Sequence, residues 1–231
     1  MPDVISSLRG GLIVSCQAKA GSPLRSSAIM AAMAQAAAIG GACAIRANTP
    51  ADVAAIRTVV ALPIIGLWKQ DIPGYEVYIT PTLAAAQAVQ AAGADIIALD
   101  ATLRPHPEGC SAADLIAAVK RELKVLVMAD ISTLEEGLAA AKAGADLVST
   151  TLSGYTPYSL QQKEPDLTLV QELSRLLSVP VIAEGRISSP GEARAALEAG
   201  AFAVVVGTAI TAPGAITARF VEAMQRYGSN S

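Results

Sequence analysis

The sequence predicts an α/β fold of the (β/α)8 (TIM) barrel type, formed by one domain that covers residues 1–231. Three observations support this prediction. The length of 231 residues suits one α/β barrel, short apolar segments are spread along the whole chain, and turns containing glycine recur between them at nearly constant intervals. Because this alternation runs from end to end, no stretch remains for a second domain.

Each of the eight predicted strands is a continuous apolar run, without alternation of polar and apolar residues. This pattern is typical of strands buried on both faces, as in a parallel sheet covered by helices. The predicted strands are Leu12–Ser15, Ala42–Arg46, Ile64–Leu67, Asp95–Asp100, Lys124–Met128, Asp146–Thr150, Val181–Glu184 and Ala203–Val206. Before the first strand, over Met1–Gly10, we expect a short helix that closes the bottom of the barrel.

A repeated turn joins helices to the strands that follow them. It reads Ala92-Gly93-Ala94-Asp95, Ala143-Gly144-Ala145-Asp146 and Ala199-Gly200-Ala201-Phe202, with a fainter first copy at Ile39-Gly40-Gly41-Ala42. The glycines of these four copies are 52, 51 and 56 residues apart, which is about the length of two βα units. A helix end commonly passes through a left-handed residue, and glycine adopts that conformation without strain. The repeat therefore indicates four pairs of units, or eight in total.

Helix starts are marked by residue types that cap helix N-termini. The predicted caps are Thr49, Thr80, Ser111, Ser132 or Thr133, Asp166 and Ser189, with proline at the first helical position after Thr49, Thr80 and Ser189. Two segments are too long for tight connections, Lys69–Ile79 and Leu152–Pro165. Long loops after barrel strands build active sites, so we expect both to border the site.

Composition limits the class of partner. Apolar residues make up 52% of the chain but aromatic residues only 3%, so the core must consist of Ala, Val, Ile and Leu. The formal net charge is −3 and Lys and Arg form no run, which argues against nucleic acid or a membrane surface as a partner. Apolar segments such as Ala31–Ala38 are too short to span a bilayer. A small-molecule partner is expected instead.

The sequence holds three widely spaced cysteines, Cys16, Cys43 and Cys110, and one histidine, His106. No CxxC pair is present, so no metal site is predicted. An odd number of thiols, together with an N-terminus that lacks a signal segment, favours the cytoplasm. We expect Cys16 to fill a core position and His106, which lies between two prolines, to be exposed.

Polar side chains gather at the C-terminal ends of the predicted strands. In a parallel barrel these ends form one face, and ligands bind there. Because lysine and glutamate are rarely buried without a partner or a task, Lys69 and Glu184 indicate function. The two aspartates, Asp100 and Asp130, have an alternative role as caps of the next helix. The full set is Gln17, Arg46, Lys69, Asp100, Asp130, Thr150 with Thr151, Glu184 with Arg186, and Gly207 with Thr208.

Two glycine turns follow the last two strands, Glu184-Gly185-Arg186-Ile187-Ser188 and Val206-Gly207-Thr208-Ala209-Ile210. Glycine allows close approach of a ligand to the backbone, and backbone N–H groups complement an anion. Phosphate sites recur after strands seven and eight of α/β barrels. The pair of turns therefore predicts a phosphate site.

Lysine at a barrel mouth supports two chemistries. An amine with a lowered pKa, such as Lys69 near the cationic Arg46, can remove a proton next to a carbonyl or form a Schiff base with that carbonyl. The residues alone leave both open. Glu184 suits the partner acid that protonates or hydrogen-bonds the carbonyl oxygen, and Gln17 and Arg46 suit substrate contacts.

Eight motifs spread over the whole chain carry a family resemblance. They are Gly11-Leu12-Ile13-Val14-Ser15-Cys16-Gln17-Ala18, Ile65-Gly66-Leu67-Trp68-Lys69, Ile79-Thr80-Pro81-Thr82, Ala98-Leu99-Asp100-Ala101-Thr102, Met128-Ala129-Asp130-Ile131-Ser132, Thr150-Thr151-Leu152-Ser153-Gly154-Tyr155-Thr156, Ala183-Glu184-Gly185-Arg186-Ile187 and Val206-Gly207-Thr208-Ala209-Ile210-Thr211. In this order they resemble the N-acetylmannosamine-6-phosphate 2-epimerases. Each motif is modest alone, and the set is specific.

The resemblance implies an isomerase without a cofactor that interconverts N-acetylmannosamine 6-phosphate and N-acetylglucosamine 6-phosphate, in sialic acid and amino sugar catabolism. It implies that Lys69 and Glu184 act at C2 of the sugar and that a homodimer is the assembly to consider. The residues it assigns to substrate are Gln17, Arg46 and Asp130, and those it assigns to phosphate are Gly185, Arg186, Gly207 and Thr208. An arginine often follows the last motif in that family, where this sequence has Ala212-Pro213. Backbone N–H groups, Arg186 or a second chain would then hold the phosphate.

Two rival functions share these features. A Schiff-base aldolase or related sugar-phosphate isomerase would use the same barrel, lysine and phosphate site, and borohydride trapping separates it from an epimerase. A barrel that binds ligand without catalysis is the second rival. A mouth with both Lys69 and Glu184 argues against it.

Overall fold

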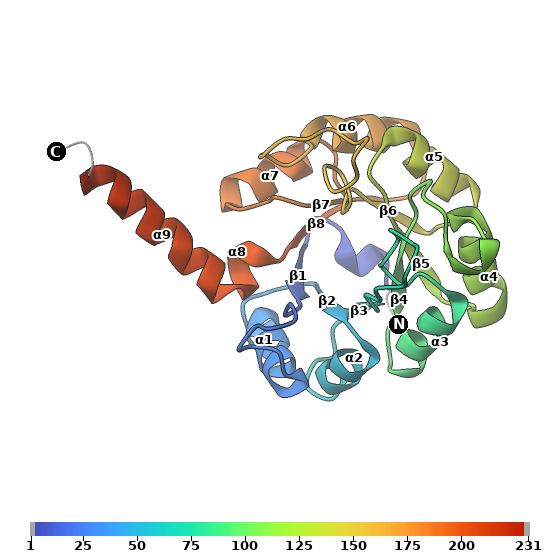
Figure 1. The fold of residues 1–231 in the computed structure, drawn as a ribbon, viewed down its shortest axis with the longest axis horizontal. Helices are drawn as coiled ribbons and strands as arrows, with labels where there is room; N and C mark the ends of the chain where they lie inside the picture. Colours follow the sequence, from blue (N-terminus) through green and yellow to red (C-terminus); the bar gives the residue numbers. More distant parts are fainter. Residues whose placement is uncertain (1–2, 229–231) are drawn as a thin grey trace.

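The computed structural model describes residues 3–228 and contains a closed barrel of parallel strands with helices around it (Figure 1). Each strand pairs with the next one along the chain, and β8 pairs with β1 to complete the ring. The strands are β1 (Leu12–Cys16), β2 (Ala44–Asn48), β3 (Ile64–Leu67), β4 (Ile96–Asp100), β5 (Leu126–Asp130), β6 (Leu147–Ser149), β7 (Val181–Glu184) and β8 (Ala203–Val206). The predicted (β/α)8 barrel is confirmed.

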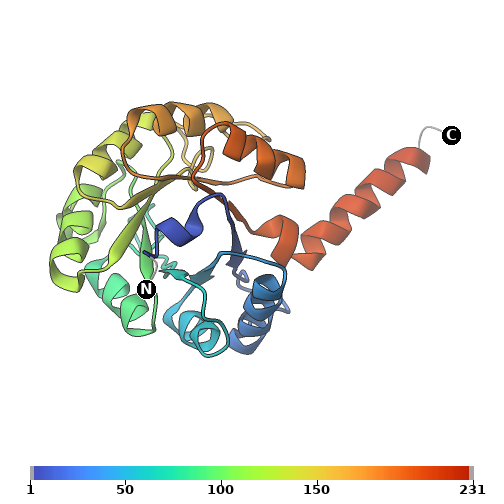
Figure 2. The ribbon, with the colours of Figure 1, turned by 180° about the vertical axis from the view of Figure 1, so that it is seen from behind.

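The helices are α1 (Ser27–Ile39), α2 (Pro50–Arg57), α3 (Leu83–Ala91), α4 (Ala112–Leu123), α5 (Leu134–Lys142), α6 (Leu167–Leu176), α7 (Pro190–Glu198), α8 (Thr208–Thr211) and α9 (Pro213–Gly228). The helices α1 to α7 form the outer ring, whereas α9 extends away from the barrel in both views (Figures 1 and 2). The short helix α8 packs on β1, and Thr211 Oγ1 donates a hydrogen bond of 2.8 Å to the Ser15 carbonyl.

The predicted bounds of β3, β7 and β8 are confirmed, and the other strands differ from the prediction by one or two residues at one or both ends. The strand β5 begins at Leu126 and not at Lys124, because Lys124 is left-handed, with φ of 52°, at the end of α4. The aspartates Asp95 and Asp146 lie just before β4 and β6. Their carboxylates accept hydrogen bonds of 2.8 Å from the N–H groups of Ile64 and Val127, so they join neighbouring strands at the barrel bottom.

The repeated glycines have the predicted left-handed backbone. Their φ angles are 92° at Gly41, 103° at Gly93, 100° at Gly144 and 103° at Gly200. A side chain at any of these positions would be strained. The sequence repeat is therefore a repeat of helix ends.

Five of the six predicted helix starts are confirmed. Each of these caps accepts a hydrogen bond from the backbone N–H three residues on, and the residues are Thr49, Ser111, Thr133, Asp166 and Ser189. The Thr80–Pro81 start is wrong, because Thr82 caps α3. The hydroxyl of Thr80 is buried, donates to the Ala98 carbonyl and accepts from the Trp68 N–H, so Thr80 ties the loop after β3 to the strands.

The chain ahead of β1 forms the 3-10 helix η1 (Ser6–Leu8). Leu8 is fully buried against the interior cluster, as expected for a segment that closes the barrel bottom. Met1 and Pro2 lie outside the described residues. The barrel interior is thus filled from below by apolar side chains, and its other end carries the polar groups.

Candidate active site

Strand periodicity places the polar residues. Successive side chains of a strand point to opposite faces, so every second residue enters the barrel. The lower inward positions are apolar and form one cluster, for example Ile13, Ile65, Met128 and Ile182. Continuing each series by two residues leads to a layer of polar or small residues at the C-terminal ends, namely Ser15 with Gln17, Arg46, Lys69, Asp100, Asp130, Ser149 with Thr151, Glu184 and Gly207. The predicted strand-end residues therefore share one mouth.

Arg46 is the centre of this layer. Its side chain is 1% exposed and donates two hydrogen bonds to Asp130, at 3.1 Å from Nη1 and 2.5 Å from Nη2. Nη1 also lies 3.2 Å from Glu184 Oε2. Burial alone would lower the pKa of Arg46, but the charges of Asp130 and Glu184 outweigh it, and the pKa is raised. One guanidinium thus faces two carboxylates.

Two polar atoms in this layer are buried without a hydrogen-bond partner in the described chain, Nε of Arg46 and Oε1 of Gln17. Gln17 uses its other end, since Nε2 donates to Ser15 Oγ at 2.9 Å. Buried polar groups normally have partners, because an unsatisfied one costs free energy. One donor and one acceptor are therefore available to a ligand that enters the mouth.

Lys69 follows β3, and contacts of its backbone fix its position. Its N–H donates to Asn48 Oδ1 at 2.8 Å, and an antiparallel bridge to Ile79 returns the loop over residues 69–79 to the strand end. The residue is solvent-exposed at the open mouth, yet enough protein surrounds the amine that burial lowers its pKa. The charge of Arg46 lowers the pKa further, while Glu184 and Asp130 oppose the shift. The shift favours the neutral amine, which is the form that a general base requires.

Glu184 ends β7, and its side chain is 15% exposed. Burial raises the pKa of this carboxyl group, Arg46 opposes the shift, and the charge of Asp130 adds to it. The carboxyl group contacts Thr151, whose Oγ1 lies 3.0 Å from Oε2. A base with a lowered pKa and an acid with a raised pKa therefore face the same volume, which is the arrangement expected for proton transfer.

The two aspartates do not cap helices, because Ser111 and Thr133 cap α4 and α5. Asp130 binds Arg46, whereas Asp100 accepts hydrogen bonds from Thr102 and from Arg104, the latter at 2.8 Å. Burial raises the pKa of Asp100. Asp100 thus has its own cation and is separate from the Arg46 group.

Tyr78 joins the site although the predicted strand-end set did not include it, and Thr151, a member of that set, has contacts that the sequence did not specify. Tyr78, in the loop after β3, packs on the interior cluster, and burial together with the charges of Asp130 and Asp100 raises its pKa to about 12. Thr151 bridges Asp130 and Glu184. Strand periodicity, extended past the end of β6, accounts for the predicted place of Thr151, whereas no sequence signal places Tyr78.

The expectation for His106 is wrong. The residue is 1% exposed, and its Nδ1 lies 3.4 Å from the Pro81 carbonyl. The loop after β4 brings His106 and Pro107 against the segment that precedes α3, while Leu103 and Pro105 in the same loop stay exposed. Burial lowers the pKa of His106. The expected core position of Cys16 is confirmed, since it is fully buried.

The predicted phosphate residues lie at the same end but differ in what they contact. Gly185 and Arg186 both have left-handed backbones, with φ of 107° and 58°. The Arg186 guanidinium donates to the carbonyls of Ser153 and Gly154, at 2.6 and 2.8 Å, and stacks on Tyr155. Arg186 therefore binds the loop after β6, while Gly207 and Thr208 begin α8 beside Ser15.

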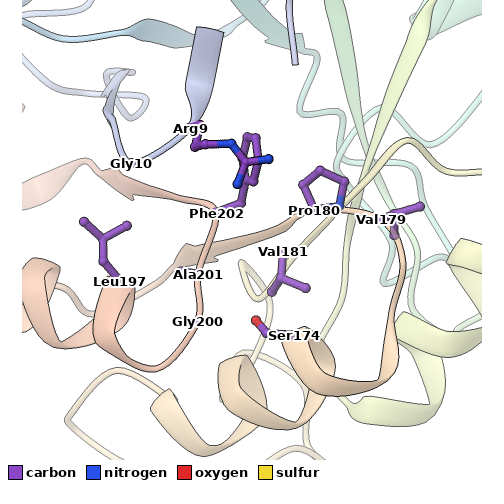
Figure 3. A pocket seen from close by; sticks show the side chains of 10 residues that line it. All are labelled: Arg9, Gly10, Ser174, Val179, Pro180, Val181, Leu197, Gly200, Ala201 and Phe202. Atoms are coloured by element: carbon purple, nitrogen blue, oxygen red, sulfur yellow. The ribbon is translucent and has the colours of Figure 1, made fainter. Parts of the chain in front are cut away.

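A hollow of about 320 Å³ lies at the opposite end of the barrel (Figure 3). It is lined by the starts of β7 and β8, the ends of α6 and α7, and Arg9, which stacks on the Phe202 ring at 4.4 Å from its centroid. No carboxylate or lysine lines it, so it offers no acid–base chemistry. Within residues 3–228 no set of three or more His, Cys, Asp or Glu residues is placed to hold a metal ion.

The fold and the mouth define a (β/α)8 barrel protein with a lysine–carboxylate site. Residues 30–226 match the family of N-acetylmannosamine-6-phosphate epimerases, a function that the family description gives as provisional. The chain belongs to this family. A relative from Caldanaerobacter subterraneus subsp. tengcongensis, provisionally named N-acetylmannosamine-6-phosphate 2-epimerase, is 56% identical over 95% of this chain and 93% of its own length.

Solved structures agree with this assignment. The N-acetylmannosamine-6-phosphate 2-epimerase from Clostridium perfringens, characterised structurally and biochemically, superposes with a TM-score of 0.92 at 49% identity, over 95% of this chain and 96% of its own. Thiamine phosphate pyrophosphorylase from Pyrococcus furiosus superposes with a TM-score of 0.62 at 20% identity, over 91% of each chain, which concerns the fold alone. Among the described residues no helix is both long and apolar enough to cross a membrane.

Proposed function

We propose that this protein is a carbohydrate 2-epimerase that interconverts N-acetylmannosamine 6-phosphate and N-acetylglucosamine 6-phosphate in sialic acid and amino sugar catabolism. Family membership and the likeness to the Clostridium perfringens enzyme support the substrate class. The observation that carries the chemistry is the mouth itself, where Lys69 with a lowered pKa and Glu184 with a raised pKa lie in one electrostatic field.

The reaction follows from the acidity of C2. In the open-chain sugar the C1 aldehyde acidifies the proton on C2, and neutral Lys69 takes it. The electron pair moves towards O1, which receives a proton or a strong hydrogen bond from Glu184 and gives an enol-type intermediate whose C2 carries the acetamido nitrogen. The other face of C2 then receives a proton, either from the Lys69 ammonium group after the planar intermediate has turned over or from a second donor while Lys69 releases its proton to water. O1 returns its proton to Glu184, and the inversion is complete. Atoms and charges balance without a cofactor.

Arg46 and Asp130 set the electrostatics of both groups. The buried cation disfavours protonation of Lys69, and the bidentate contact to Asp130 fixes its position. We assign Arg46 Nε and Gln17 Oε1 to substrate hydroxyl or amide groups, because each lacks a partner in the described chain. Asp130 completes the substrate contacts of this group.

We assign the phosphate to the turns at Gly185 and Gly207, with Thr208 next to the second turn. Arg186 contributes by holding the loop after β6 over the site, since its guanidinium donates to two carbonyls of that loop. Remote binding energy of this kind orders a flexible open-chain sugar for reaction. Unphosphorylated N-acetylmannosamine should therefore show a lower maximal rate and a higher half-saturation concentration. Equal maximal rates for the two sugars would contradict this assignment.

The decisive experiment follows exchange of the C2 proton in deuterated water. Wild-type enzyme should incorporate deuterium at C2 during epimerisation, and Lys69→Gln should lose both exchange and epimerisation while binding is kept. The matched control is Lys142→Gln, an exposed lysine at the end of α5, and it should behave like wild type. Full exchange in Lys69→Gln, or a borohydride-stable sugar adduct on Lys69, would move the assignment to a Schiff-base aldolase.

We also infer a homodimer in which each chain contributes one barrel domain. The support is α9, which extends away from its own barrel and exposes Phe220, Val221 and Met224 at 68%, 46% and 73% (Figures 1 and 2). An apolar helix face of this kind is expected to be covered by another surface, and a second copy is the occupant that every preparation contains. Sedimentation should give a dimer for wild type and a monomer for Phe220→Asp with Met224→Asp. The control Ile39→Asp, at an exposed residue on α1, should remain dimeric.

The cytoplasm is the compartment we assign. The support is chemical, since Cys16, Cys43 and Cys110 are all free thiols. Cell fractionation checks this assignment, and recovery of the protein with secreted material would contradict it.

A further inference from the structure

Thr151 occupies a position that the proposed reaction does not explain. Its Oγ1 lies 2.7 Å from Asp130 Oδ1, 3.0 Å from Glu184 Oε2 and 2.8 Å from Ser149 Oγ. All three distances are hydrogen-bond distances. Besides the cation Arg46, Thr151 therefore contacts both Asp130 and Glu184.

The number of protons restricts how these contacts are made. A threonine hydroxyl carries one proton and two lone pairs, so it donates once and accepts at most twice. Two ionised carboxylates would need two protons from Thr151. For both contacts to be hydrogen bonds at once, one carboxyl group has to carry a proton of its own and donate it to Thr151.

Asp130 is the ionised member of the pair. It receives two hydrogen bonds from the Arg46 guanidinium, a contact in which a carboxylate acts only as acceptor. It also has the shorter distance to Thr151. When the single Thr151 proton is given to Asp130, the contact with Glu184 Oε2 can be a hydrogen bond only if Glu184 donates to Thr151. In the contact with Ser149 either hydroxyl can donate, and Ser149 is then the donor.

The charged groups around Glu184 agree with this order. Arg46 faces it from β2, Lys69 from β3 and Asp130 from β5. Asp100 and Arg104 form a separate ion pair. Tyr78, in the loop after β3, is close enough to Asp130 and Asp100 for their charges to raise its pKa. The inward residues of β1 and β8, Gln17 and Gly207, carry no charge. When Lys69 is neutral, one guanidinium balances one carboxylate, so a protonated Glu184 leaves the group without excess charge. Burial raises the pKa of Glu184, whereas Arg46 lowers it, and so does the Thr151 hydroxyl when Thr151 is the donor. The direction of the bond between Thr151 and Glu184 thus decides the sign of the Thr151 contribution.

We propose that Thr151 is a positioning residue that holds Glu184 as a protonated acid, through hydrogen bonds from Glu184 to Thr151 and from Thr151 to Asp130. The other oxygen of Glu184 is then left to face the sugar, and the proton on Oε2 is stored at a fixed place beside Arg46. The acid role of Glu184 in catalysis rests on the proposed function, whereas its protonation state and the direction of the hydrogen bonds do not.

The test uses the sign of a pKa change. If Thr151 accepts from protonated Glu184, it stabilises the neutral form, and Thr151→Val should lower the pKa of Glu184. If Thr151 instead donates to an ionised Glu184, the same change should raise that pKa. Infrared difference spectra over a pH series measure it directly, with Glu184→Gln identifying the carboxyl band. Thr151→Ser keeps the hydroxyl and should match wild type.

A second control is Thr150→Val. The Thr150 hydroxyl binds the backbone N–H and carbonyl of Glu184 but not its carboxyl group, so the pKa should stay near the wild-type value. A higher pKa in Thr151→Val, or a wild-type Glu184 that is ionised throughout the working pH range, would overturn the proposal. If Thr151→Val does not fold, Thr151→Ala and the wild-type spectrum alone still decide.

Kinetics give an independent measurement. Thr151→Val should lower kcat about tenfold, the equivalent of one hydrogen bond, with little change in KM, and kcat should begin to fall at a lower pH than in wild type. Thr151→Ser should restore both. A loss of kcat in Thr151→Val with an unchanged pH profile would reduce Thr151 to a packing role. Absence of turnover on the phosphorylated sugar in wild type would refute the proposed function and leave the infrared result unaffected.

Discussion

The two ends of the barrel use charge in different ways. At the bottom, Asp95 pairs with Arg57 and Asp146 with Lys120, and each aspartate also accepts from a strand N–H, so each carboxylate has its own cation. At the mouth, one buried guanidinium faces both Asp130 and Glu184. The partly exposed ion pairs at the bottom, with one cation for each carboxylate, join neighbouring elements. At the mouth two buried carboxyl groups share one cation, and such an arrangement shifts the pKa values of its members. The imbalance marks the end that does chemistry.

The repeat in the sequence shows the same principle at the bottom. Two copies of the turn end in Asp95 and Asp146, each beside a basic partner, but the third ends in Phe202. Arg9 stacks on the Phe202 ring, so the third copy keeps a cation and replaces the carboxylate by an aromatic face. The bottom of the barrel therefore uses two kinds of partner for a cation, a carboxylate and an aromatic ring.

The strongest test of this comparison exchanges one lysine at each end. Lys69→Gln should lower turnover about 10²–10⁴-fold, because it removes the general base, and should leave the melting temperature unchanged or higher. Lys120→Gln should leave turnover unchanged and cost about 1 kcal/mol of stability or less, because the pair with Asp146 is partly exposed. Steady-state kinetics and thermal denaturation of both variants measure this. Equal effects of the two substitutions on turnover would contradict the assignment of chemistry to the mouth and of stability to the bottom.

The two arginines provide the next comparison. Arg46→Met leaves Asp130 buried without its cation and should cost about 3–5 kcal/mol in the free energy of unfolding. In any folded fraction the pKa of Lys69 should rise, because a like charge has been removed, so activity should begin at higher pH. Arg57→Met breaks a half-exposed pair and should cost about 1 kcal/mol. Urea denaturation gives both values, and an Arg46→Met variant as stable as wild type would refute the comparison.

A smaller effect concerns the pH dependence of stability. The pKa of Glu184 is raised in the folded protein above its usual 4.5, so the folded state binds more protons than the unfolded state from about pH 4.5 up to the folded pKa. Stability from this group is present at low pH and is lost as the pH rises through that window. Glu184→Gln should remove this loss of stability, so the variant should become more stable relative to wild type as the pH increases. Denaturation at several pH values checks the sign, and a relative loss would mean a lowered pKa.

The smallest expected effect is at the variant copy of the repeat. Arg9→Met should cost about 0.5–1 kcal/mol through the lost contact with Phe202 and leave catalysis unchanged. Chemical denaturation and the epimerase assay test it together. A loss of turnover would give the barrel bottom a role in catalysis that its charges do not indicate.

The sequence predicts the barrel well because its signals are local and repeated. Left-handed glycines, caps and apolar runs each depend on a few neighbouring residues, so Gly93 or Ser189 can be interpreted without the fold. Thr80 and His106 are misread because their contacts are with segments distant in the chain. Their residue types suit a cap and a solvated loop, and tertiary contacts override that preference.

At the site, strand ends predict which residues meet but not how they pair. The convergence of Arg46, Lys69, Asp130 and Glu184 follows from parallel topology, whereas the sharing of Arg46 depends on barrel register. Arg186 shows the limit, since its place after β7 is predictable but the direction of its guanidinium, towards the loop after β6, is not.

The pairing of β8 with β1 has a consequence during protein synthesis. The ring closes only when Val204 and Val206 reach Leu12 and Val14, residues separated by almost the entire chain. At ribosomal rates of about 5–20 residues per second, the first strand waits roughly 10–40 s for its last neighbour. Throughout that time one edge of an apolar strand is without a partner and can pair with another chain. Newly made copies on crowded ribosomes are therefore most exposed to misassembly at the N-terminal strand, long before the mouth exists.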